Sequence, residues 1–213
     1  QTQNIDVDYA VTDDKGASAD GSFSITLTGT NDAPTATYTT NLSALEGASS
    51  ISGQLTSSDV DASGSPTFFL SDASGNTQDA SGNSFSIDGL TLNTDGSFSF
   101  DPSNSSYNSL RDGQSQSLTV NYVAKDDQGL NSNVQSFNIN VLGTNDAPTA
   151  TYTTAHVVDA SGNALAPQEG GASVAGQLTS SDVDASGNPT YSLVGSSIPG
   201  LTLSSDGSWT FDP

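Results

Sequence analysis

Cysteine and methionine are absent from this sequence of 213 residues, and only three residues are Lys or Arg. Without cysteine, the chain can form no disulfide, thiol nucleophile or thiolate zinc site. The three cations stand against 24 Asp and Glu, which gives a formal net charge of −21. A nucleic-acid binder needs many cations to neutralise phosphates, and an anionic membrane surface repels such a chain. We therefore expect no nucleic-acid partner.

Long apolar runs are also lacking. No run approaches the roughly 18 apolar residues that span a bilayer, and the N-terminus has no signal-peptide pattern, so we expect no membrane insertion. Because the sequence starts at Gln1, we expect a fragment or a mature segment. Leu, Ile, Val and Phe make up 42 of 213 residues, which at this charge is the composition of a disordered chain. The order of the residues indicates otherwise.

The sequence repeats itself with a period of about 113 residues. GTNDAPTATYTT occurs at 29–40 and again at 143–154, and GQLTSSDVDASG at 53–64 returns at 176–187. LTLNTDGSFSFDP at 90–102 corresponds to LTLSSDGSWTFDP at the C-terminus. The changing offsets locate an insertion around residues 157–166, and a loop within residues 71–84 that the second copy lacks. Both regions carry the turn sequence DASGN, which is typical of surface loops.

Between the turns, apolar residues alternate with polar ones, which is the pattern of half-buried strands. Ile5, Val7 and Tyr9 share one face in this way, and Asp95-Gly96 separates two such segments as a hairpin turn. No helical periodicity lasts for ten residues. In one full repeat we expect strands near 35–40, 50–56, 66–70, 84–88, 90–93, 97–101, 117–124 and 134–142.

That number of short strands is typical of an immunoglobulin-like sandwich. The predicted fold class is all-β, with tandem β-sandwich modules in an end-to-end rod. We expect residues 1–32 to be the last two strands of a preceding module plus a linker. Residues 33–145 would form a complete module, and residues 146–213 an incomplete module that lacks its last two strands.

The acidic residues fall into two sets. Those in DASGN and DG turns cap the backbone, as Asp95 and Asp206 would. The second set lies at corresponding places in both repeats, where the loops converge on the junction between modules, and it includes the two glutamates of the chain. Its members are Asp13, Asp14, Asn31, Asp32, Glu46, Asp59 and Asp61, and then Asp126, Asp127, Asn145, Asp146, Glu169, Asp182 and Asp184.

Several carboxylates at one junction require a cation. Two unit charges 4 Å apart repel by about 4 kcal/mol at an effective dielectric constant near 20. Hard oxygen ligands in variable number, with almost no His or Cys, favour Ca²⁺ and place Mg²⁺ second. The alternative is a set of loose acidic loops on a solvated face. We predict a calcium junction.

Three motifs in this order carry a family resemblance: NDAP at the junction, DVD after the second strand, and DDxG before the penultimate connection. They resemble the tandem cadherin-like modules of large bacterial adhesins, including VCBS repeats, over nearly the whole chain. The resemblance implies an extracellular extender at the bacterial cell surface, stiffened by calcium at each linker, with any adhesion ligand bound elsewhere in the protein. It also implies that Asn31, Asp32, Asn145 and Asp146 are linker ligands.

By the same resemblance, the DVD pairs and the glutamates come from the module that follows each linker. Gly29 and Gly143 stand where a classical cadherin linker has another aspartate, which departs from the pattern. The glycine-rich nonapeptide calcium repeat found near the secretion end of such adhesins is absent.

Other functions have weaker support. A glycosidase needs two positioned carboxylates, which DVD supplies, but without an aromatic-rich cleft. A Ser-His-Asp triad would depend on His156, which has no counterpart in the first repeat. Sugar binding would need exposed aromatics, whereas Trp209 aligns with Phe98 on a strand. Alternating threonines, as at Thr35 and Thr37, reflect β-propensity rather than an ice-binding array. We predict no enzyme activity and no catalytic residue.

The ends of the chain suggest an alternative function. The two N-terminal strands are those that the C-terminal module lacks, and a sandwich without two strands exposes an edge and an apolar face. The strands could fill that gap in a neighbouring chain, so the protein could be a subunit of a self-assembling filament or surface layer. A longer polypeptide that supplies the missing strands itself explains the same pattern.

Overall fold

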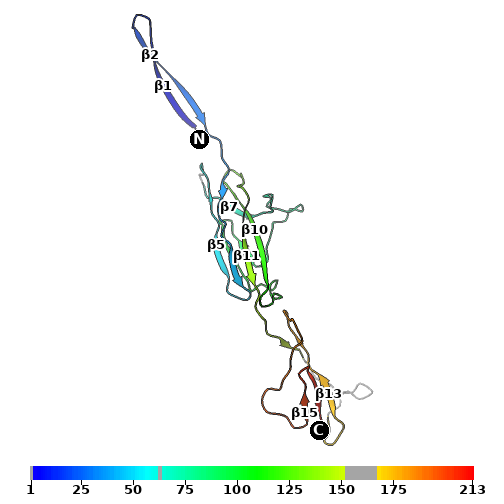
Figure 1. Cartoon of the computed structure of the whole chain (residues 1–213). Coiled ribbons are helices and arrows are strands. Elements are labelled where there is room, and N and C mark those ends of the chain that lie inside the picture. The colour runs from blue at the N-terminus through cyan, green and yellow to red at the C-terminus, as the bar shows by residue number, and fades with distance from the viewer. Residues whose placement is uncertain (1, 62–63, 152–166) are drawn as a thin grey trace.

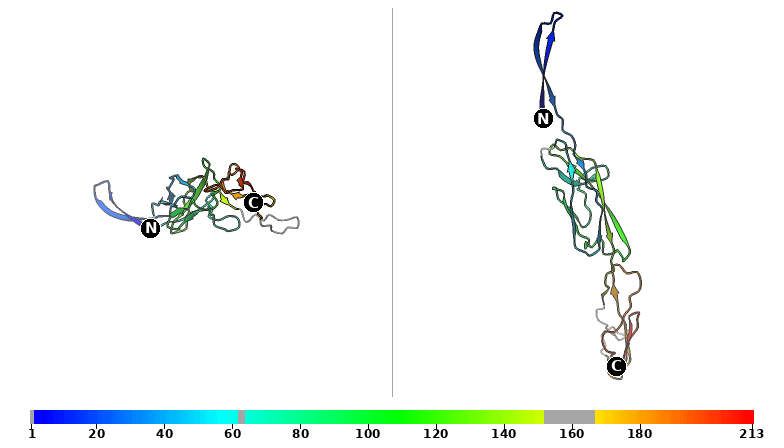
Figure 2. Two further views of the ribbon diagram at one scale, coloured as in Figure 1. Left: turned by 90° about the horizontal axis from the view of Figure 1, so that it is seen from below. Right: turned by 60° about the vertical axis from the view of Figure 1, so that its left-hand side comes forward.

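The computed structural model describes residues 2–61, 64–151 and 167–213, in which all regular elements are β-strands. Three parts follow one another along one long axis (Figure 1, Figure 2): the hairpin β1–β2, the central sandwich β3–β11 and the C-terminal unit β12–β16. The predicted all-β, end-to-end architecture is confirmed. Within the described ranges, no helix is long and apolar enough to cross a membrane.

The hairpin consists of β1 (Thr2–Thr12) and β2 (Ser18–Thr28), which pair antiparallel along their full lengths. Asp13 forms the turn, since its carboxylate accepts the backbone N–H groups of Lys15 and Ala17 at 2.9 and 2.8 Å. This tip lies at the end of the hairpin opposite the linker to the central sandwich (Figure 1).

The central sandwich packs two sheets against each other. One sheet has the strand order β4-β11-β10-β7, in which β4 runs parallel to β11, and the other has the order β5-β9-β8; β3 and β6 form a short separate ladder. This division of seven strands is that of an immunoglobulin-like sandwich. The bounds are β3 (Thr35–Ala36), β4 (Leu42–Leu45), β5 (Ile51–Gln54), β6 (Ser57–Ser58), β7 (Thr67–Leu70), β8 (Leu90–Leu92), β9 (Ser97–Phe100), β10 (Ser115–Lys125) and β11 (Gln135–Leu142).

The core lies between the two sheets and is rich in aromatic side chains. Tyr122, on β10, is fully buried, and its hydroxyl accepts the Tyr38 backbone N–H at 2.8 Å and donates to the Tyr38 carbonyl oxygen at 3.0 Å. Phe98 packs across its strand pair over Gly53, where an added Cβ would come within 2.4 Å of the ring. The alternating pattern of the sequence therefore buries one face of each strand.

The C-terminal unit repeats part of this arrangement. Its sheet β13-β16-β15 corresponds to β5-β9-β8, and Trp209 lies over Gly176 as Phe98 lies over Gly53. Trp209 therefore lies on a strand at the position of Phe98, as predicted, but it is only partly buried. The bounds are β12 (Thr149–Ala150), β13 (Val174–Gln177), β14 (Ser180–Ser181), β15 (Leu201–Leu203) and β16 (Ser208–Phe211).

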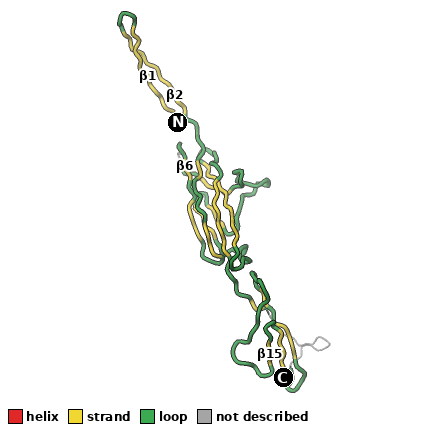
Figure 3. The backbone as a smooth tube through the Cα atoms, viewed as in Figure 1, coloured by secondary structure: helices red, strands yellow, loops and turns green. Residues whose placement is uncertain are grey.

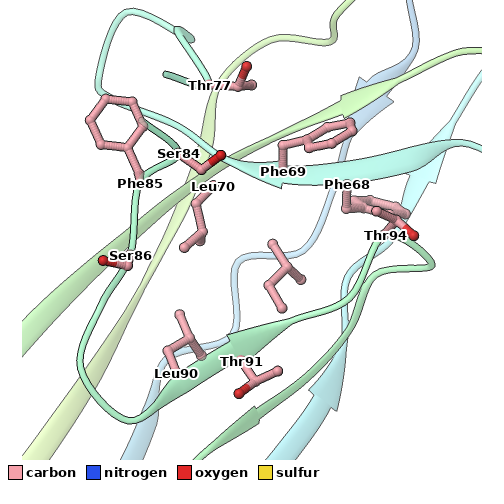
Figure 4. Close-up of a pocket in the computed structure, with 11 residues that line it drawn as sticks. Phe68, Phe69, Leu70, Thr77, Ser84, Phe85, Ser86, Leu90, Thr91 and Thr94 are labelled. Carbon is pink, nitrogen blue, oxygen red and sulfur yellow. The ribbon is translucent and has the colours of Figure 1, made fainter. Parts of the chain in front are cut away.

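The short strand β6 was not predicted, and within the two sheets two further segments differ from the prediction. The segment 84–88 forms no strand; it is part of the long connection between β7 and β8 (Figure 3), where Gln78 and Ser84 make one isolated bridge. Phe85 from this segment instead flanks a cleft at the sheet edges (Figure 4). The prediction also missed β4, whose partner β11 lies about a hundred residues away in the sequence.

Candidate functional site at the linkers

Two linkers, residues 29–34 and 143–148, join the three parts of the chain, and both carry the sequence GTNDAP. At the first linker, the Asn31 side-chain amide donates to Asp126 Oδ2 at 2.7 Å, and Gln128 Nε2 donates to Asn31 Oδ1 at 2.6 Å. Asp126 is held in place because its other oxygen accepts two backbone N–H groups of the β10–β11 turn, from Gln128 and Leu130. The linker is therefore bonded to the module that follows it.

The DVD loop of the central sandwich reaches the same linker. The Asp32 backbone N–H donates to Asp61 Oδ2 at 3.0 Å, and the Asp61 N–H donates to Asp59 Oδ1 at 3.2 Å. The second Asp61 oxygen is buried without a hydrogen-bond partner. Asp59, Asp126 and Asp127 line one cleft of about 80 Å³ beside it. The predicted convergence of these residues at one end of the module is present.

The carboxylates at this linker perturb one another. The Asn31 side-chain bond, together with the turn N–H groups, holds the pKa of Asp126 below its usual value. At Asp59 the N–H of Asp61 alone would lower the pKa, but the side-chain contact with Asp61, partial desolvation and the charges of Asp61 and Asp126 outweigh it. The pKa of Asp59 is therefore raised, because nearby negative charges disfavour its ionised form.

The second linker makes the corresponding contacts with the C-terminal unit. The Asp146 N–H donates to Asp184 Oδ2 at 3.3 Å, and the Asp184 N–H donates to Asp182 Oδ1 at 3.4 Å. Asn145, Asp182 and Asp184 line one cleft. The side-chain contact with Asp184, then desolvation and the charges of Asp184 and Asp146, raise the pKa of Asp182. Both DVD pairs therefore come from the part that follows the linker, as the resemblance implies.

Glu46 lies at the second linker, not the first. It follows β4, which runs parallel to β11 and so ends where β11 enters the second linker. Its backbone N–H donates to the Leu142 carbonyl at 2.8 Å, and its Oε2 accepts the Thr144 N–H at 3.2 Å. Glu46 is only 5% exposed, and Oε1 is buried without a hydrogen-bond partner. The expectation that this glutamate comes from the module after its linker is wrong: it comes from the module before.

Three other predicted site residues lie away from both linkers. Asp13 and Asp14 lie at the hairpin tip. The strands of the hairpin have 11 residues each and are about 36 Å long, so they separate the tip from the first linker by about that distance. Glu169 is exposed at the far end of the C-terminal unit, where Gly170 N–H donates to the Pro213 carbonyl. The structure thus brings together neither Asp13–Asp14 with Asn31 nor Glu169 with Asn145.

Arg111 is a linker residue that the sequence interpretation missed. Its Nε donates to the Asp184 carbonyl oxygen at 3.0 Å and Nη2 to the Ala185 carbonyl at 2.7 Å, so it ties the central sandwich to the C-terminal unit. The only signal in the sequence is scarcity, since Arg111 is one of three Lys and Arg residues among 213.

The linkers therefore offer carboxylate, amide and carbonyl oxygens, the donors of a hard cation. No group of three or more His, Cys, Asp or Glu in the described ranges is already arranged to hold a metal ion. Among the buried oxygens without a hydrogen-bond partner are two carboxylate oxygens, Asp61 Oδ1 and Glu46 Oε1, and a bound cation would satisfy both. A cation would still have to draw neighbouring carboxylates toward it.

A larger cleft offers no acid–base chemistry. It has a volume of about 340 Å³ and lies between the edges of β7 and β8, next to the connection that contains Phe85 (Figure 4). Phenylalanine, leucine, serine and threonine line it, without a titratable side chain. His156 lies outside the described residues.

No family model matches the sequence, and no curated protein matches it. Among solved structures, the chain is similar to the protocadherin gammaB7 EC3-6 cis-dimer (17% identity, TM-score 0.40, 100% of this chain and 50% of that one). It is also similar to mouse protocadherin-24 EC1-3 (17%, 0.48, 99% and 66%) and to Drosophila N-cadherin EC1-4 (11%, 0.41, 98% and 49%). The chain spans about half the length of two of these structures.

Proposed function

We propose that this chain is a structural extender of an extracellular adhesion protein, in which Ca²⁺ at each linker stiffens a row of β-sandwich modules. The observation that carries the proposal is the pair of buried carboxylate oxygens without a partner, one at each linker. An ionised carboxylate oxygen buried without a partner is costly, and a cation that binds it removes this penalty.

The ligands would come from both sides of each linker. At the first linker Asn31, Asp59, Asp61, Asp126 and Asp127 would hold the ion. At the second linker the ligands would be Glu46 from the preceding module together with Asn145, Asp146, Asp182 and Asp184. Bound Ca²⁺ would hold neighbouring parts of the chain together by electrostatic attraction; its role would be structural and not catalytic. Only the folded, aligned state places all these oxygens together, so ion binding favours it.

The repeat motifs support a large bacterial surface adhesin as the parent protein. NDAP, DVD and DDxG occupy corresponding positions in the two repeats, and the residues of DVD and NDAP meet at both linkers. An extender of this kind places an adhesive tip away from the cell. We place the adhesion ligand outside this segment, because the polar clefts at the two linkers are those that we assign to the cation.

Calcium titration tests the proposal. We expect isothermal titration calorimetry to detect Ca²⁺ binding, the melting temperature to rise with Ca²⁺, and small-angle X-ray scattering to show a longer, narrower distribution of molecular lengths. Mg²⁺ at the same concentration is the matched control and should act more weakly. If chelation leaves both the melting temperature and the length distribution unchanged, the linkers are not cation sites.

A further inference from the structure

The three Lys and Arg residues of the chain lie at three different places, and one of them bridges a linker. Lys15 lies in the turn at the hairpin tip, and the Lys125 ammonium lies over the Phe69 ring, 5.9 Å from its centre. The Arg111 guanidinium instead bonds the DVD loop that follows the second linker. In a chain of net charge −21, the place of this one cation distinguishes the second linker from the first.

Arg111 belongs to a short, closed turn that lies directly against the start of the second linker. The Gln114 N–H donates to the Arg111 carbonyl oxygen at 2.8 Å, and the Arg111 N–H donates to Gln114 Oε1 at 3.0 Å. Gly143, the first residue of the linker, donates its N–H to the Gln114 carbonyl at 2.9 Å. An added Cβ at Gly143 would lie 2.3 Å from the Arg111 carbonyl oxygen, so the turn fits here because this residue has no side chain.

The groups that Arg111 bonds are of the kind that a hard cation binds. Its Nε and Nη2 donate to the successive carbonyl oxygens of Asp184 and Ala185 at 3.0 and 2.7 Å. Two donors of one planar guanidinium fix the direction of a contact as well as its length. Backbone carbonyl oxygens are also ligands of Ca²⁺, so the guanidinium uses acceptors that an ion could otherwise bind.

The two DVD loops differ in the way that this contact predicts. At the first linker, Asp61 Oδ1 is buried without a hydrogen-bond partner. Asp184 is the counterpart of Asp61 in the second repeat and is only 6% exposed, yet neither of its carboxylate oxygens is among the buried ones that lack a partner. The contacts described at the first linker join Asn31 and Asp32 to carboxylates through amide and backbone N–H groups. The DVD loop with the stronger demand for an added ion is therefore the one at the first linker.

We propose that Arg111 is a resident cation of the second linker, a positioning residue that keeps the C-terminal unit aligned with the central sandwich when Ca²⁺ is absent. The inference rests on the proposed function, in which the ion aligns the parts at the first linker. Chelation then frees the first linker, whereas the second stays held on the side of its DVD loop. Glu46 Oε1 still leaves the second linker able to bind an ion, so Ca²⁺ adds to the Arg111 contact and does not replace it.

Distance measurements across each linker of the full chain test the proposal. Because the chain has no cysteine, spin labels can be attached to pairs of introduced cysteines at exposed strand positions. Ser22→Cys with Thr91→Cys spans the first linker, and Thr91→Cys with Thr202→Cys spans the second. In a chelator, pulsed electron spin resonance should give a distance distribution across the second linker about half as wide as that across the first, because only the second has the bidentate contact. Ca²⁺ should narrow the first distribution more than the second.

Variants assign the effect to Arg111. Arg111→Gln should make the second distribution in chelator as wide as the first, and since the side chain is exposed, each part of the chain should stay folded. Arg111→Lys keeps the charge but not the planar fork, so it should restore only part of the alignment. Lys125→Gln removes the same charge away from the second linker and is the matched control, which should leave the second distribution unchanged.

A pair of glycine variants tests the seat of the turn. Gly143→Ala should act like Arg111→Gln, because the added Cβ displaces the backbone of the Arg111 turn from the linker. Gly187→Ala, in the loop after the second DVD motif, is its control, since an added Cβ there meets nothing within 4 Å.

Two results would overturn the proposal: equal widths across the two linkers of the unmodified chain in chelator, or an unchanged second distribution in Arg111→Gln. Ca²⁺ that narrows neither distribution would contradict the proposed function instead. The Arg111 variants in chelator would still show whether the residue holds the second linker, so the two failures are distinguishable.

Discussion

Replacing Glu46 with glutamine should have opposite effects on stability with and without Ca²⁺. The side chain is 5% exposed, Oε2 accepts one N–H at 3.2 Å, and Oε1 has no partner. Glutamine retains an acceptor for the Thr144 N–H and removes the buried charge. In a chelator, an unsatisfied buried polar group costs about 1–3 kcal/mol and a charged one costs more, so replacing the charge by a neutral amide should raise the free energy of unfolding by about 1 kcal/mol. That is about 4 °C in melting temperature for a unit of this size.

In Ca²⁺ the direction should reverse. At a hundredfold excess over Kd, the unmodified chain gains about 2.7 kcal/mol from binding. If the loss of a charged ligand weakens affinity a hundredfold, the gain falls to about 0.4 kcal/mol by the same relation. The calcium-induced rise in melting temperature should then shrink by roughly 9 °C.

Scanning calorimetry of both chains in chelator and in Ca²⁺ measures these four melting temperatures. Glu169→Gln is the matched control, since Glu169 holds the same place in the second repeat but is exposed, and it should melt at the temperatures of the unmodified chain in both conditions. A Glu46→Gln variant that loses the same stability in both conditions would refute the reasoning. Glu46 would then be a hydrogen-bond acceptor for the linker and no cation ligand.

Three further predictions concern the rest of the fold. Arg111→Ala should broaden the length distribution in small-angle scattering by freeing the second linker, while Lys15→Ala, at the hairpin tip, should not. The Ser97 hydroxyl, and then the Ser97 N–H, hold the pKa of Asp95 below its usual value near 3.8. The stability that this gives above the unfolded pKa is lost as pH falls through the lower folded value, so the melting temperature should drop below about pH 4, less steeply in Asp95→Asn. Tyr122→Phe should cost about 1–3 kcal/mol in chemical denaturation by leaving two buried backbone groups unpaired, whereas Tyr9→Phe, the exposed counterpart, should be neutral in dilute monomer.

Local pattern was sufficient to predict much of the fold. Alternation marked β10 and β11, and the Asp95-Gly96 turn joins β8 to β9 as expected. Local pattern also misled at residues 84–88, where alternation is present but neither sheet edge accepts the segment. A strand is defined by its partner, and the partner of β4 is distant in the sequence, so its four residues carry no local signal.

The main error at the site is the linker to which Glu46 belongs. Each strand carries the chain from one end of a sandwich to the other, and the expected strand near residues 35–40 already leads away from Asn31. β4 continues in that direction, parallel to β11, and so brings Glu46 beside Thr144. The family resemblance, which pairs the glutamate with the linker before its module, therefore misled. The Asn31–Asp126 contact was predictable because the GTNDAP and DDxG motifs are both unambiguous in position.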